Sequence, residues 1–100
     1  METVFRVEPS HSVTRQIGED AGLLGDELDR VVDMAAGNPG AMHMLLELKT
    51  ALEEINPKHG FEIVLACLKA KNLTGHVLYS FIKQNGIAGS VMHMQKAGWL

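Results

Sequence analysis

The chain has 100 residues, of which 46% are apolar and 21% are charged. This length suits one domain, and the composition is that of a folded globular protein rather than a disordered tail. Nine basic residues against twelve acidic residues leave a net charge of −3, which provides no attraction to a nucleic-acid backbone.

The single cysteine, Cys67, excludes a disulfide bond within the chain. The sequence has no apolar run of the length that crosses a bilayer, and it lacks the basic, apolar and small-residue succession of a signal peptide. We therefore expect a cytoplasmic protein that does not contact a membrane.

Residues 1–24 are predicted to form an N-terminal arm, because Pro9, Gly18 and Gly22 interrupt them and no apolar spacing persists. Residues 3–7 are rich in β-favouring residues, so the arm is expected to be partly disordered or a short strand. Such a strand needs a partner, either the body of the domain or another chain. Residues 25–100 form the single predicted domain.

Helical spacing begins at Leu24 and continues to the predicted stop at Gly37. Asn38 then suits an N-cap and Pro39 the first position of a second helix, which extends to Ile55. The residues predicted to face inward from this second helix are Ala41, Leu45, Leu48, Leu52 and Ile55.

Residues 61–71 are apolar on nearly every face, which predicts the central and most buried helix. A buried strand over residues 63–68 is the alternative. The alanines, the length and the basic last turn with Lys69 and Lys71 favour the helix.

Thr74 is a predicted N-cap for a fourth helix that ends at Asn85 and Gly86. A short fifth helix is predicted over residues 89–97, with few apolar residues to bury. The predicted fold is therefore all-α: a compact bundle of four principal helices plus a short C-terminal helix, with a flexible or partner-docked N-terminal arm.

The helix start Gly37-Asn38-Pro39-Gly40-Ala41, followed by an apolar helix and by Leu73-Thr74-Gly75, resembles small uncharacterised all-helical proteins of bacteria and their phages. The resemblance covers about residues 35–84, and its motifs are turn and cap signals. It implies an all-helical fold without a known activity, and it assigns no catalytic residue.

Met42-His43-Met44 and Met92-His93-Met94 repeat one tripeptide, and thioether and imidazole groups suit Cu(I). A copper site built from Met42, His43, Met92 and His93 is therefore one hypothesis. Neighbouring helical residues point about 100° apart, so one tripeptide cannot direct all its side chains at one ion. The preferred interpretation has no metal and no cofactor, with methionines filling the core and both histidines on polar faces.

No catalytic motif is present: the sequence has no phosphate loop, no nucleophile elbow and no cysteine pair at zinc spacing. We therefore expect no enzyme. Residues 86–89 form a glycine hairpin whose backbone amides suit a phosphate, which gives a weak nucleic-acid-backbone binder as a further alternative. Few cations lie near this hairpin, so nucleic acid is not the expected partner.

Protein–protein interaction is the predicted function, because large apolar side chains exceed what so few helices cover. A symmetric homodimer is the simplest assembly, and an unidentified second protein is the alternative partner. The predicted interface residues are Met42, Met44, Leu46, Met92, Met94, Trp99 and Leu100.

Overall fold

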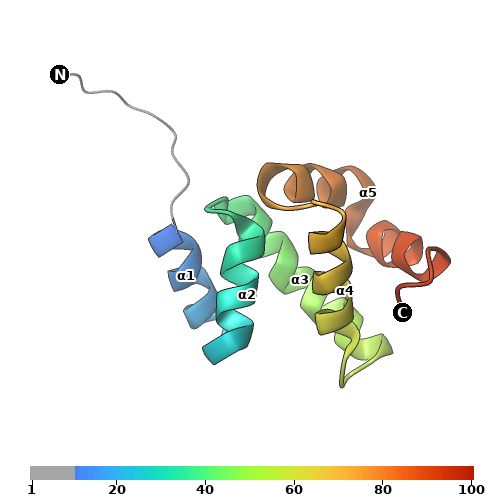
Figure 1. The fold of residues 1–100 in the computed structure, drawn as a ribbon, viewed down its shortest axis with the longest axis horizontal. Helices are drawn as coiled ribbons and strands as arrows, with labels where there is room; N and C mark the ends of the chain where they lie inside the picture. Colours follow the sequence, from blue (N-terminus) through green and yellow to red (C-terminus); the bar gives the residue numbers. More distant parts are fainter. Residues whose placement is uncertain (1–10) are drawn as a thin grey trace.

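The computed structural model describes residues 11–100, and the predicted strand at residues 3–7 lies outside them. These residues form five helices: α1 (His11–Asp20), α2 (Gly25–Ala35), α3 (Pro39–Ile55), α4 (Gly60–Ala70) and α5 (Gly75–Lys96). The structure confirms the all-α fold. Helices α1 and α2 lie side by side, α4 packs on α2 and α3, and α3 and α5 run across the molecule (Figure 1).

Helix α1 lies inside the segment that was predicted to be an arm, so for residues 11–20 that prediction is wrong. The helix packs on α2 and α3. Its buried residues are Thr14 and Gly18, both small. Ile17 also packs against the core, but the fully buried positions of α1 are small, so the sequence lacks the repeated large apolar side chains that normally identify such a helix.

The corner between α2 and α3 forms as predicted. Ala36 and Gly37 adopt the left-handed conformation, with φ of 49° and 80°. The Asn38 side chain then accepts a hydrogen bond of 3.0 Å from the Ala41 N–H, and Pro39 occupies the first helical turn. This cap satisfies one of the free amides at the start of α3, which fixes where the helix begins.

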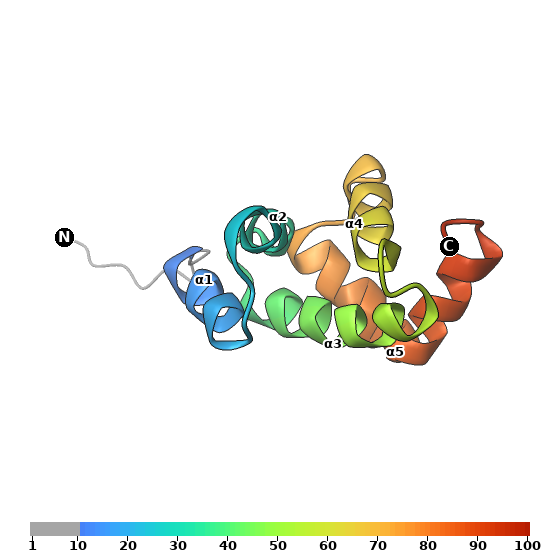
Figure 2. The same cartoon turned by 90° about the horizontal axis from the view of Figure 1, so that it is seen from below.

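Helix α3 is the centre of the molecule, because it packs against each of the other four helices. Ala41, Leu45, Leu48 and Leu52 of its predicted inward face are completely buried, whereas Ile55 is 45% exposed. Figure 2 shows α5 running alongside α3, while α4 projects to one side of this pair. The inward face of α3 therefore supplies the core, and the prediction fails only for its last member.

Helix α4 is a helix as predicted, but it is not the most buried one. Phe61, Val64, Leu65 and Leu68 face the core, whereas Ile63 and Ala66 are exposed. The residues between α3 and α4 make a tight corner, in which the His59 N–H donates to Asn56 Oδ1 at 3.1 Å. A Cβ added at Gly60 would lie 3.0 Å from the Leu52 carbonyl oxygen, so the two backbones approach closely there.

Helix α5 has 22 residues and is the longest of the helices in residues 11–100, so the last helix is not short as predicted, although the predicted stop at Gly86 is present as a kink within it. Gly86 inside it has φ 74° and ψ 167°, a backbone conformation that only glycine adopts readily. The chain changes direction there (Figure 1). The Ser90 hydroxyl donates to the Gly86 carbonyl at 2.7 Å, so the second half of α5 continues directly from this bend.

None of the helices formed by residues 11–100 is long and apolar enough to cross a membrane.

Candidate functional site

A groove of about 300 Å³ separates α2 from α4. Met34 and Leu65 line its apolar part, and both are almost fully buried, with 2% and 4% exposure. Ala66 lies at its edge on α4. The remaining lining residues are charged: Arg30 and Asp33 from α2, and Glu62 and Lys69 from α4. The groove therefore combines an apolar floor with charged walls.

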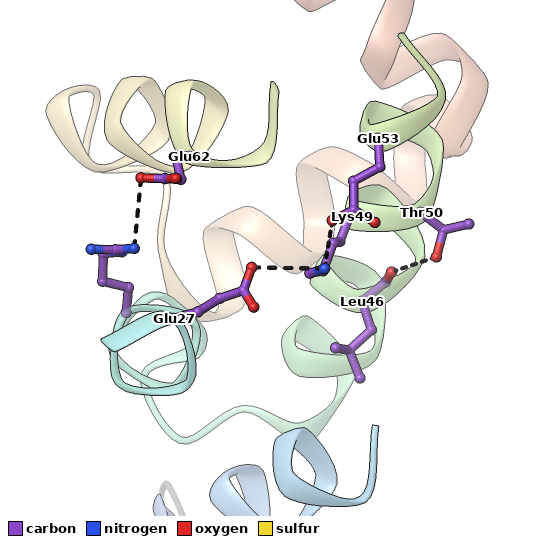
Figure 3. A network of polar contacts seen from close by, with 7 residues as sticks. Glu27, Leu46, Lys49, Thr50, Glu53 and Glu62 are labelled. Atoms are coloured by element: carbon purple, nitrogen blue, oxygen red, sulfur yellow. Dashed lines mark hydrogen bonds and ion pairs between the residues drawn. The ribbon is translucent and has the colours of Figure 1, made fainter. Parts of the chain in front are cut away.

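Two ion pairs connect the walls of this groove. Arg30 lies 3.8 Å from Glu62, and Lys69 lies 3.5 Å from Asp33. All four side chains are more than half exposed, so these pairs contribute little to stability. Figure 3 shows Glu62 at its place on α4 with its ion pair. The charged groups thus remain accessible to a partner from solvent.

An apolar strip runs along the solvent side of α4, next to the groove. We call it the outer face of α4, and it consists of Ile63, Ala66, Cys67 and Ala70. Ile63 is 37% exposed, Ala66 and Ala70 are exposed, and Cys67 is half-buried. These residues are three or four positions apart, so they share one side of the helix. Among the described helices, α4 packs mainly on α3 and α2, and this exposed strip lies on the side away from its core residues.

Lys49 of α3 forms an ion pair with α2. Its ammonium lies 2.6 Å from Glu53 and 3.7 Å from Glu27 of α2 (Figure 3). It also lies 5.9 Å from the Phe61 ring centroid. The hydrogen bond with Glu53 raises the pKa of Lys49, and burial opposes that shift. Lys49 therefore connects α2 and α3 through a partly buried ion pair.

The structure places the two Met-His-Met segments in different surroundings. Met42 is completely buried, and its Cε lies beneath Gly18 of α1. His43 is exposed on α3. Met92 is 54% exposed, and His93 packs edge-on between Phe81 and Trp99, with ring centroids 5.5 and 6.4 Å away. Among residues 11–100, no group of three His, Cys, Asp or Glu side chains is arranged to hold a metal ion.

We expect the double substitution His43→Ala and His93→Ala to leave the metal content of the purified protein unchanged. Loss of the two ring contacts of His93 lowers the free energy of unfolding by about 0.5–1.5 kcal/mol. Elemental analysis and urea denaturation measure the two quantities. If the wild type contains near-stoichiometric copper and the double variant does not, the protein has a copper site and this interpretation is wrong.

The predicted interface residues differ in accessibility. Met42 and Met94 are completely buried, so they are core residues and present no surface to a partner. Met92 is exposed. Four further candidates are partly buried and pack against the core of the chain itself: Met44, Leu46, Trp99 and Leu100.

Trp99 is a predicted interface residue, but in the structure it contacts its own chain. Its backbone N–H donates to the Met94 carbonyl at 3.0 Å, and Lys71 lies 5.9 Å from its ring centroid. The segment after α5 therefore folds back on its own chain. Of the predicted interface residues, only Met92 remains well exposed.

Residues 86–89, which were predicted to form a glycine hairpin, lie within α5, and Gly86 forms the bend of this helix. His43 and Glu47 both lie exposed on α3.

The residues of the outer face of α4 were not selected from the sequence, because their segment was expected to be buried on every side. An exposed isoleucine within an otherwise ordinary apolar helix has no local sequence signal.

Comparisons with family models, with curated proteins and with solved structures found no match. The resemblance to small helical proteins of bacteria and phages therefore stays a prediction.

Proposed function

We propose that this protein is a non-catalytic interaction module that associates with a second copy of itself through the outer face of α4. The observation that supports this proposal is the exposure of Ile63, Ala66 and Ala70 along one side of a helix whose other side is packed into the core. An apolar helix face left without a neighbour is typical of a docking surface.

The packing of the rest of the molecule supports α4 over the surface predicted from the sequence. Met42 and Met94 are in the core, and Trp99 and Leu100 contact their own chain, so Met92 is the one predicted interface residue that is well exposed, without exposed apolar neighbours from that set. The outer face of α4, in contrast, lies beside an apolar groove with accessible charges. A central apolar patch with a polar rim is the usual anatomy of a protein interface.

We expect the intact protein to sediment as a dimer at micromolar concentration, and Ile63→Glu to weaken association about tenfold or more. The reason is that the substitution buries an unpaired carboxylate in the interface. Analytical ultracentrifugation over a concentration series measures the dissociation constant. Circular dichroism of the same sample shows that the variant is folded.

Two further variants serve as controls. Leu24→Glu changes an apolar residue that is 77% exposed at the start of α2, and it should leave the dissociation constant unchanged. Met92→Glu tests the surface predicted from the sequence and should also leave it unchanged. A wild-type mass of one chain at every concentration would contradict the proposal, as would dissociation caused by Met92→Glu and not by Ile63→Glu.

A further inference from the structure

The charges beside the outer face of α4 have a pattern that fits a second copy of the same helix. Glu62 and Lys69 are seven residues apart, which is close to two helical turns, so they lie on one edge of α4. Both line the groove toward α2, so the structure places them on the same side. Ala66 lies between them along the helix. The edge is therefore acidic near the start of α4 and basic near its end.

This order of charges distinguishes the two directions in which a second α4 can lie. In an antiparallel pair, Glu62 of one copy faces Lys69 of the other, and the reciprocal pair forms at the same time. In a parallel pair related by a two-fold axis, the edge with Glu62 and Lys69 lies beside the opposite edge of the other α4, so neither of these charge pairs forms. The two reciprocal charge pairs form only in the antiparallel arrangement, so charge complementarity favours the antiparallel pair.

The apolar residues on the outer face suit the same arrangement. A two-fold axis that relates Glu62 to Lys69 crosses α4 next to Ala66, where the side chain is a single methyl group. Small side chains at a crossing point allow helices to approach to about 8 Å, the short end of the usual range. Ile63 and Ala70 then lie on opposite sides of the crossing, so that Ile63 of one copy packs against Ala70 of the other.

We propose that two copies associate through antiparallel α4 helices around a two-fold axis beside Ala66, with Glu62 of each copy paired with Lys69 of the other. This inference rests on the proposed self-association and specifies its geometry. Lys69 then lies between Asp33 of its own chain and Glu62 of the second copy. The Lys69 and Glu62 side chains are 70% and 59% exposed, so both have room for the added partner.

Charge reversal tests the pairing. We expect Glu62→Lys alone and Lys69→Glu alone each to raise the dissociation constant about 5-fold to 50-fold, because each replaces two attractive pairs by two repulsive ones. The double variant with both reversals restores the opposite-charge pairing between copies. Its dissociation constant should return to within about threefold of the wild-type value.

The double variant also separates the contacts between copies from those within one chain. With both reversals, the lysine at position 62 still faces Arg30 and the glutamate at position 69 still faces Asp33. The pairs within the chain therefore stay broken, and recovery reports the contact between copies alone. A wild-type dimer whose double variant is as weak as the single variants overturns the antiparallel geometry and leaves self-association intact. A monomeric wild type overturns both.

Disulfide cross-linking locates the axis independently. On a Cys67→Ser background, Ala66→Cys should form a disulfide with itself across the dimer under mild oxidation, because the axis brings the two copies of position 66 together. Ala70→Cys is the matched control on the same face. Its two copies should be about 13 Å apart along the helix direction, which is beyond the reach of a disulfide. Equal cross-linking at both positions, or cross-linking at position 70 alone, overturns the proposed axis.

Discussion

Leu48→Ala is expected to lower the free energy of unfolding by about 2–5 kcal/mol. Leu48 lies on the inward face of α3 and is completely buried, and α3 packs against all the other helices. Removal of the side chain therefore leaves a cavity that several helices would have to close together, which a close-packed interior resists. Urea denaturation followed by circular dichroism measures the change.

Two other substitutions test the same assignment of core and surface. Leu65→Ala removes a side chain that is 4% exposed on α4 and should cost a similar amount. Glu54→Ala changes an exposed position on α3 and should alter stability by less than about 0.5 kcal/mol. Equal and small losses at all three positions would show that the core faces are misplaced.

Helices α2 to α4 are predictable because their boundaries have strong local causes. The Asn38 cap and Pro39 begin α3 in the same way in almost any surroundings, since the cap satisfies a free amide and proline needs no partner there. The inward face of α3 follows from apolar spacing alone. Such features depend on neighbouring residues in the sequence, which are known before the fold is known.

Helix α1 and the continuity of α5 depend on contacts that the sequence does not display. In α1 the buried positions are Thr14 and Gly18. In the sequence, threonine suggests a polar face and glycine suggests a helix breaker, so neither indicates a buried helix face. Their packing against α2 and α3 outweighs the low helix propensity of glycine. Gly86 indicates a stop, and it does break the helical geometry, but the chain resumes a helix at once beyond it.

The candidate site illustrates a different limit of sequence analysis. Residues 61–71 are apolar on nearly every face, and this pattern is the same whether the second face is covered by the chain itself or by another chain. The arrangement of the helices decides between these cases: α4 follows a tight corner and packs on α3 and α2, which leaves its other side exposed. The outer face of α4 is therefore a consequence of helix arrangement and not of composition.

Gly18→Val is expected to lower the free energy of unfolding by about 1–3 kcal/mol, because α1 has no space for a side chain at this position. A Cβ at Gly18 would lie 2.6 Å from Leu28 Cδ1 and 2.6 Å from Met42 Cε. Both atoms end flexible side chains, but Leu28 is 4% exposed and Met42 completely buried, so neither can move into solvent without loss of core packing. The added side chain must instead push α1 away from α2 and α3.

The matched control is Glu19→Val, which introduces the same side chain at the next position of α1, where the residue is exposed. It should change stability by less than about 0.5 kcal/mol. Amide hydrogen exchange provides the second measurement. In the wild type, the amides of α1 should be protected together with those of α2, and Gly18→Val should remove the protection of α1 before that of α3. If Gly18→Val and Glu19→Val are equally harmless and α1 exchanges as fast as an unfolded peptide in the wild type, then α1 is not packed on the domain. In that case Leu28 and Met42 would form an exposed apolar surface, and the second copy would have a competing place to dock.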